Sequence, residues 1–221
     1  MSRRAWGIAG VVTGVAVLGA VGGPLAYAAL QEDAAPAATV QAQPEDVELA
    51  ADTDGTWTVA EGSSAGYRVD EVLNGADVTV AGTTEQVDGS LVVDGGDLVE
   101  AELTVDVASI TTDSDRRDSY FRDNVMDVAS NPTATFVVTG PVDLPELTGT
   151  PVTVPVTGEL TLAGTTQPVE AALSAVRAAD GVDVSGSIPV TFADHRVEAP
   201  DLGFVSVEDE GSVEFLLHFV Q

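Results

Sequence analysis

The stretch that decides the fold is LTVDVASITTDSDRRDSYFRDNVMDVASNPTATFVVTG, residues 103–140. It begins with residues 103–107, where apolar and polar side chains alternate as they do in a half-buried strand. An amphipathic helix is predicted from about Arg116 to Asp127, and it must end before Pro132 because a residue that precedes proline avoids the helical region. A second alternating strand follows over residues 133–139. The pattern predicts one short helix between two strands.

The rest of the chain from residue 55 onward is typical of β-structure. Short alternating segments are separated by turn dipeptides such as Asn74-Gly75 and Asp180-Gly181, which predicts a sandwich or a barrel. In the segment 98–107, Val99, Ala101, Leu103, Val105 and Val107 share one face and acidic or hydroxyl side chains take the other. A sheet that is apolar on one side must close around that side, and a barrel does so without leaving exposed edges. The expected strands are 56–59, 65–71, 76–81, 90–93, 98–107, 133–139, 152–162, 168–176, 182–191 and 212–220.

The charge is strongly acidic. The 221 residues contain 36 Asp and Glu, eight Arg, no Lys and no Cys, and the net charge is −28. Because Arg3 and Arg4 precede every acid, residues 32–221 carry six arginines against the 36 acids, a net charge of −30. Phosphate backbones would repel such a body, so nucleic-acid binding is excluded. The absence of cysteine removes disulfides, thiolate metal sites and a cysteine nucleophile.

The N-terminal segment predicts a membrane helix. Ala5 to Leu30 is an uncharged run of 26 residues, about 39 Å long as a helix, and it follows Arg3 and Arg4. We expect a retained anchor in the cell membrane with the domain outside the cytoplasm. The alternative is a signal peptide cut near Ala28, which would make the protein secreted. The expected organisation is therefore an anchor or signal peptide (1–30), a disordered acidic tether (31–54) and a β-barrel domain (55–221).

Three motifs suggest chemistry, and each has a simpler interpretation. Gly62-Ser63-Ser64-Ala65-Gly66 matches the G-x-S-x-G elbow of hydrolases, but a strand pattern rather than a helix follows it, so we expect a turn. His195 and His218 are the downstream histidines that a catalytic Ser64 would need, and loop contacts are the simpler role for His195. Asp52 to Gly55 begins like a calcium loop without its later ligands. We therefore expect neither catalysis nor a cofactor nor a metal site.

Several segments together resemble one family. V-x-V-A-S-I-x-T, R-R-D-x-Y-F-R, Asp127 and N-P-T-A-T-F lie within residues 105–136, and V-T-G-E-L-T-L-A-G-T-T follows at 156–166. Residues 188–194, 199–204 and 213–217 fit the closing strands. These residues are similar to the YceI-like family of exported polyisoprenoid-binding proteins, over about 56–221. The N-terminal membrane segment, acidic spacer and arginine-only composition look like the actinobacterial branch.

The resemblance implies an extended, lipocalin-like antiparallel β-barrel of about eight strands with one or two short helices. It also implies a long apolar channel that binds a polyisoprenoid or similar long-chain lipid without catalysis. The family often has a histidine after the first long strand, where this chain has Asp70-Glu71-Val72, so no role of that histidine transfers. Related barrels often pair, so a homodimer is compatible with the sequence.

The channel lining follows from the inner strand faces. We expect Phe121, Met126, Arg117 and Asp118 at the channel mouth, where the last two either fix the helix to the barrel or hold a lipid headgroup. An alternative function is an envelope stress or interaction module whose barrel is filled by its own side chains. The expected lining residues are Phe136, Val138, Ile188, Val190, Phe192, Phe215, Leu217 and Phe219.

Overall fold

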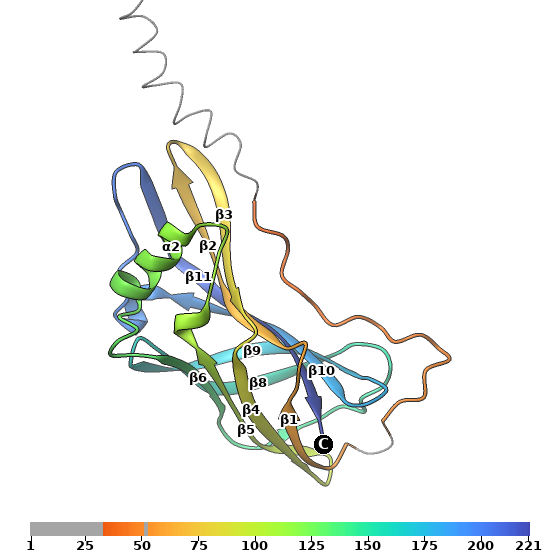
Figure 1. Ribbon diagram of the computed structural model, residues 1–221. Coiled ribbons are helices and arrows are strands. Elements are labelled where there is room, and N and C mark those ends of the chain that lie inside the picture. Colours follow the sequence, from red (N-terminus) through yellow and green to blue (C-terminus); the bar gives the residue numbers. More distant parts are fainter. Residues whose placement is uncertain (1–32, 51–52) are drawn as a thin grey trace, which may run out of the picture.

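A computed structural model describes residues 33–50 and 53–221, and its dominant feature is one antiparallel sheet that closes on itself (Figure 1). Eight strands form the barrel in the order β1-β4-β5-β6-β8-β9-β10-β11, and β11 pairs with β1 to complete the circle. The expected mainly β, closed barrel with a short helix is confirmed. The strands are β1 Gly55–Val59, β2 Ser64–Leu73, β3 Ala76–Thr84, β4 Val87–Asp94, β5 Asp97–Asp106, β6 Thr133–Val138, β7 Val142–Asp143, β8 Val152–Leu162, β9 Thr165–Arg177, β10 Val182–Thr191 and β11 Val205–Val220.

The longest strand, β11, divides the barrel into two levels. Its C-terminal residues Phe219 and Val220 pair with β1, whereas its residues 205–216 pair with β2. The β2–β3 hairpin therefore extends beyond the closed ring at one end of the molecule (Figure 1). At this end the sheet is open, because among residues 33–50 and 53–221 no further strand pairs with β3, and Thr83 at its end forms an isolated bridge with Thr111.

The helical segment covers this open end. It consists of α2 (Asp115–Tyr120) and one wider π-type turn, η2 (Phe121–Val125), and the short 3₁₀ turn η1 (Val107–Ser109) precedes it. The Ser114 hydroxyl accepts a hydrogen bond from the Arg117 backbone N–H, which caps the helix. Figure 1 shows α2 beside the β2–β3 hairpin rather than against the closed lower part of the barrel.

Several strands are longer than the sequence predicted, β7 was not predicted, and two differences, in β5 and β11, have a clear physical cause. The register between β4 and β5 shifts by one residue near Val92, so Leu98 is buried and Val99 is exposed. The prediction that Val99 points inward is therefore wrong. The register shift is a β-bulge, which reverses the alternation of inward and outward side chains at this residue. The last strand begins at Val205 instead of Ser212, since pairing with β2 extends it through an irregular acidic stretch.

The described part of the expected tether, residues 33–50, lies against the barrel in extended form. The Ala34 N–H donates to the Thr79 carbonyl oxygen at 2.9 Å, and the Val40 N–H donates to the Ser185 hydroxyl at 3.1 Å. Val40 is buried. These contacts replace the expected free tether for residues 33–50, and burial of Val40 gives the physical reason. The expected anchor or signal peptide at 1–30 lies outside the described residues, and within those residues no helix is long and apolar enough to cross a membrane.

Candidate functional site

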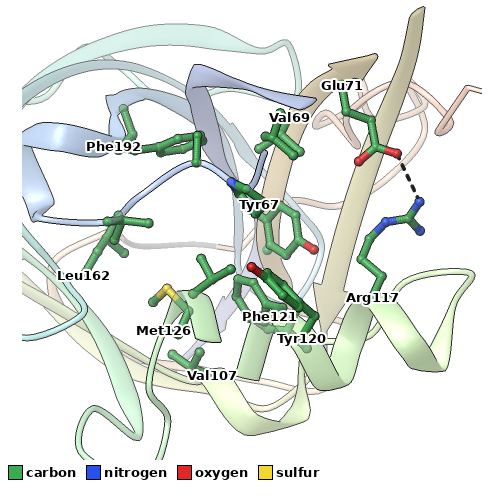
Figure 2. A pocket seen from close by; sticks show the side chains of 18 of the residues that line it. Tyr67, Val69, Glu71, Val107, Arg117, Tyr120, Phe121, Met126, Leu162 and Phe192 are labelled. Carbon is green, nitrogen blue, oxygen red and sulfur yellow. Dashed lines mark hydrogen bonds and ion pairs between the residues drawn. The ribbon is translucent and has the colours of Figure 1, made fainter. Parts of the chain in front are cut away.

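A cavity of about 650 Å³ lies at the open end of the barrel, between the β2–β3 hairpin, the helical segment and the loop before β11. Its wall is almost entirely apolar, and Figure 2 shows Tyr67, Val69, Phe121, Met126 and Phe192 around it. Pockets that bury a small organic ligand have volumes of about 300–1,000 Å³. This cavity is therefore large enough for an apolar ligand of substantial size.

The inward residues of β2 form one side of the cavity. Ala65, Tyr67, Val69, Glu71 and Leu73 are alternate residues of this strand and all line the cavity. The ring of Tyr67 stacks on that of Phe121, with 4.8 Å between the ring centroids. This contact joins the helical segment to the sheet across the open end, so the cavity has a covering wall where no strand is present.

A small part of the otherwise apolar cavity wall, which we call the polar side, contains charged side chains. Glu71 is buried, and the Arg117 Nη2 donates to its carboxylate at 3.4 Å, the contact drawn in Figure 2. Arg117 also pairs with Asp113. Asp118, by contrast, does not line the cavity, and its carboxylate accepts hydrogen bonds from the Thr112 N–H and hydroxyl at 2.9 and 2.7 Å. The polar side therefore contains one paired arginine, Arg117, and the exposed Arg116, which forms no ion pair within the described residues.

A second, smaller cavity of about 90 Å³ lies in the lower part of the barrel, and it shares no lining residue with the first. Inward residues between the two levels separate them. Along β8 and β10, Leu160 and Ile188 line neither cavity and are almost completely buried. By strand register Phe136 pairs with Leu160, and Phe215 pairs with Gly186, two residues before Ile188 on β10. We call Phe136, Leu160, Ile188 and Phe215 the floor; none of them lines the upper cavity, and Phe136 and Phe215 line the lower one.

Two glycines let the floor rings lie close to the barrel wall. A Cβ at Gly158 would lie 2.5 Å from the Phe136 ring, and a Cβ at Gly186 would lie 2.6 Å from the Phe215 ring. Both glycines are on strands that neighbour the phenylalanines. The absence of a side chain at these positions gives the rings their space. The expected single long channel is thus replaced by an upper cavity and a largely filled lower barrel.

Comparison with known proteins identifies the family. The family model described as a YceI-like domain matches residues 57–219, about three quarters of the chain. The chain belongs to the YceI-like domain family. A polyisoprenoid binding domain from Saccharophagus degradans, implicated in plant cell wall breakdown, has a similar structure with a TM-score of 0.61 and 20% identity, covering 74% of this chain and 97% of that one.

A second similar structure is BcnA of Burkholderia cenocepacia, with a TM-score of 0.58 and 21% identity, covering 71% of this chain and 95% of that one. The comparison with curated proteins finds no match. At these identities the two structures show that this YceI-like chain shares their fold.

The residues expected to line a channel divide between the levels of this YceI-like barrel. Val190 and Phe192 line the upper cavity, as do Phe121, Met126 and Arg117 of the expected mouth. Ile188 belongs to the floor, and Asp118 lies outside the cavity. Phe136, Val138, Phe215, Leu217 and Phe219 line the lower cavity.

The residues that sequence reasoning missed are mainly those of β2 and of the loop at 197–204. Their alternation was visible, since Ala65, Tyr67, Val69 and Leu73 are every second residue, but Glu71 interrupts the apolar face. The loop has no periodic signal. Its position follows from the pairing of Val205 with Leu73, which joins parts of the chain that are far apart in the sequence.

The hydrolase motif does not assemble a catalytic triad. Ser64 begins β2, as a strand residue paired with Leu216. His195 is buried and its Nδ1 lies 3.0 Å from the Thr165 carbonyl oxygen, whereas the His218 Nδ1 lies 2.6 Å from an Asp183 carboxylate oxygen. Within the described residues, no hydrogen bond joins the Ser64 side chain to either histidine. The same residues contain no cluster of His, Asp and Glu suited to a metal ion.

Replacing Arg117 with Met is expected to lower the free energy of unfolding by about 2–4 kcal/mol, because Glu71 would remain buried without its partner. The double variant Glu71→Leu/Arg117→Met should recover most of this loss, since no buried charge is left. Denaturant unfolding of the wild type and of these two variants measures both effects. Equal stability of Arg117→Met and the wild type would show that the pair does not hold the polar side together.

Burial raises the pKa of Tyr67 to about 12, while the attraction of Arg117 opposes this rise. The folded state therefore keeps the phenol protonated at a pH where the unfolded chain has lost the proton. The stabilisation is complete below the unfolded pKa of about 10 and is lost as the pH rises to about 12, a total of roughly 2–3 kcal/mol. Unfolding measured across this range should show a smaller decline for Tyr67→Phe. An identical decline in both proteins would contradict the assignment.

Proposed function

We propose that this protein binds a polyisoprenoid or similar long-chain lipid, without catalysis, and that the lipid tail occupies the upper cavity. The observation that carries the proposal is the apolar cavity of about 650 Å³. The printed description of the Saccharophagus degradans structure as a polyisoprenoid binding domain supports the same ligand class. Location outside the cytoplasm and attachment to the membrane are further parts of this proposal.

The size of the cavity limits the tail. One water molecule occupies about 30 Å³ in the liquid, and we take the same volume for each non-hydrogen atom of a ligand with its hydrogens. A cavity of 650 Å³ then accommodates roughly 20 non-hydrogen atoms. That number corresponds to about four isoprene units of five carbons each. Burial of each methylene contributes about 0.8 kcal/mol, so one isoprene unit would contribute roughly 3–4 kcal/mol before the costs of binding. A longer tail would have to extend out of the mouth or displace the floor.

The charges favour an uncharged headgroup. Arg117 is paired with both Glu71 and Asp113, and Arg116 and Glu198 also line the cavity with opposite charges. The described part of the chain lies within the segment 32–221, whose net charge is −30. A diphosphate would therefore meet a single arginine without an ion pair, Arg116, and several carboxylates, whereas a hydroxyl or a carbonyl could hydrogen-bond at the polar side. We accordingly propose a prenyl lipid with a neutral polar head.

Organic-solvent extraction of the full chain, purified from its own host, tests this function. Mass spectrometry of the extract should find a prenyl lipid with a neutral head, in an amount close to that of the protein. An extract that contains just the bulk phospholipids of the host membrane would contradict the proposal. Such an extract would instead favour the alternative function, an interaction module whose barrel is filled by its own side chains, as the lower part of this barrel largely is.

A further inference from the structure

The end of the barrel that contains the cavity mouth exposes large apolar side chains. Among the described residues, Phe204 is 56% exposed and Leu202 is 47% exposed, the highest values for large apolar side chains. Both residues also line the upper cavity. We call Leu202 and Phe204 the apolar rim. Their exposure has no packing explanation within the barrel, since the next most exposed large apolar side chains, Val72 and Val99, reach 38%.

The rim is held in place by the sheet rather than being part of a free loop. The Asn74 N–H, at the tip of the β2–β3 hairpin, donates to the Phe204 carbonyl oxygen at 2.8 Å, and the Leu202 N–H donates to the Val205 carbonyl oxygen at 2.8 Å. Figure 1 shows the β2–β3 hairpin and the loop before β11 at the same end of the molecule. Val72, which pairs with Ser206, is also exposed at this end. The hairpin and the loop therefore present apolar side chains together.

The described chain begins in the same part of the molecule. Asp33 accepts a hydrogen bond from the Thr79 N–H at 3.0 Å, on the edge strand β3. The uncharged run ends at Leu30, and three residue steps span at most about 10 Å. Thr79 lies three residues after Ala76, the first residue of β3, so the distance along the strand between these two residues is about 10 Å. The described chain therefore begins beside the hairpin that holds the rim loop, and in the sequence the uncharged run ends three residues before that point.

We propose that the apolar rim docks on the surface of a lipid bilayer, so that the cavity mouth faces the membrane. Leu and Phe are suited to the boundary between headgroups and acyl chains, where the apolar face of a peripheral segment is buried by about 5–10 Å. Burial of the rim would bring the lipid entrance to the bilayer, so a tail could pass into the cavity without crossing water. This proposal goes beyond lipid binding itself and stands on exposure and chain geometry.

The charge of the protein selects the kind of bilayer. Asp201 and Glu198 flank the rim on the same loop, and the acidic body would be repelled by anionic lipids. We therefore expect docking on zwitterionic phosphatidylcholine and weaker docking when phosphatidylglycerol is added. Lower salt should increase this difference, because electrostatic repulsion is then less screened.

The test uses the full chain in phosphatidylcholine vesicles, and the absence of native cysteine allows a single label at each chosen position. Leu202→Cys and Phe204→Cys report on the rim. Val99→Cys and Val137→Cys are matched controls, since these valines are exposed on β5 and β6. Each thiol carries an environment-sensitive fluorophore. The emission of labels at 202 and 204 should shift to shorter wavelengths. Iodide should quench these labels less than the control labels, by a factor of roughly three or more, as expected for burial at the bilayer boundary.

Equal iodide quenching at all four positions would overturn the proposal. The protein-to-vesicle ratio is then lowered until each vesicle holds less than one chain on average. If the rim labels lose their protection under this condition, the proposal is also overturned, because the partner of the rim would be a second copy of the chain. Lipid extracted from the same samples is measured separately. Protected rim labels without a bound prenyl lipid would support the docking proposal and contradict the proposed function. A bound prenyl lipid with unprotected rim labels would support the proposed function and contradict the docking proposal.

Discussion

Replacing Ala134 with Trp is expected to reduce lipid binding by more than about 100-fold, because the indole would fill much of the upper cavity. Ala134 lies on β6 opposite Val105 and lines the cavity. Tryptophan adds about nine non-hydrogen atoms, close to half of the roughly 20 that the cavity accommodates. The loss corresponds to about two isoprene units of the tail. Binding is measured with a labelled prenyl alcohol of about four isoprene units.

The same variant distinguishes a hollow from a packed core. A large side chain inserted into a well-packed interior costs about 1–3 kcal/mol, whereas one inserted into an empty cavity should change the free energy of unfolding by less than about 1 kcal/mol. Val137→Trp is the control, since Val137 is exposed on the same strand. Strong destabilisation by Ala134→Trp, or unchanged binding of the prenyl alcohol, would show that the cavity does not receive the tail.

Replacing Phe136 with Ala is expected to remove part of the floor and to lengthen the preferred tail. The ring is buried, packs against Gly158 and lies at the level that separates the two cavities. Its loss should lower the free energy of unfolding by about 3–5 kcal/mol, as for other buried phenylalanines. The opened space would join the lower cavity to the upper one and admit about one to two further isoprene units.

Competition between prenyl alcohols of different length measures this shift. The ratio of the dissociation constants for long and short tails should change by at least about tenfold in favour of the longer one. Phe219→Ala is the matched control, because Phe219 lines the lower cavity near the closed end and should lose stability without joining the cavities. An unchanged length preference in Phe136→Ala would show that the floor does not limit the tail.

Periodicity predicted the strands of this barrel well where one face is continuously apolar. The strands β8 and β10 have the expected bounds, and the inward positions Ile188, Val190, Phe215 and Leu217 are buried. Their burial follows directly from alternation, since the side-chain period of a strand is two residues.

Periodicity failed where tertiary pairing decides the structure. The bulge at Val99 and the early start of β11 both depend on the register with a neighbouring strand, which alternation within one segment does not reveal. The family resemblance implied a long channel, yet the sizes of Phe136, Leu160, Ile188 and Phe215 interrupt it. A pattern identifies which side chains point inward, but not how much space remains between them.

The covering wall of the site was predicted in part. The helix was expected at the right place, and Phe121 and Met126 line the cavity. The contribution of β2 was missed because the buried Glu71 looks like a surface residue in the sequence. Its burial depends on Arg117, which lies 46 positions away along the chain, so the pair becomes recognisable when the helix is placed against the hairpin.

The most direct test of the central claim is photo-crosslinking from inside the upper cavity. A small photoreactive side chain at position 69, which lines the cavity, is compared with one at position 137 on the outer face, each in the full chain within its own host. Mass spectrometry of the adducts identifies the bound molecule. The account predicts a prenyl-lipid adduct at position 69 and none at position 137. No lipid adduct at position 69, or the same adducts at both positions, would contradict it.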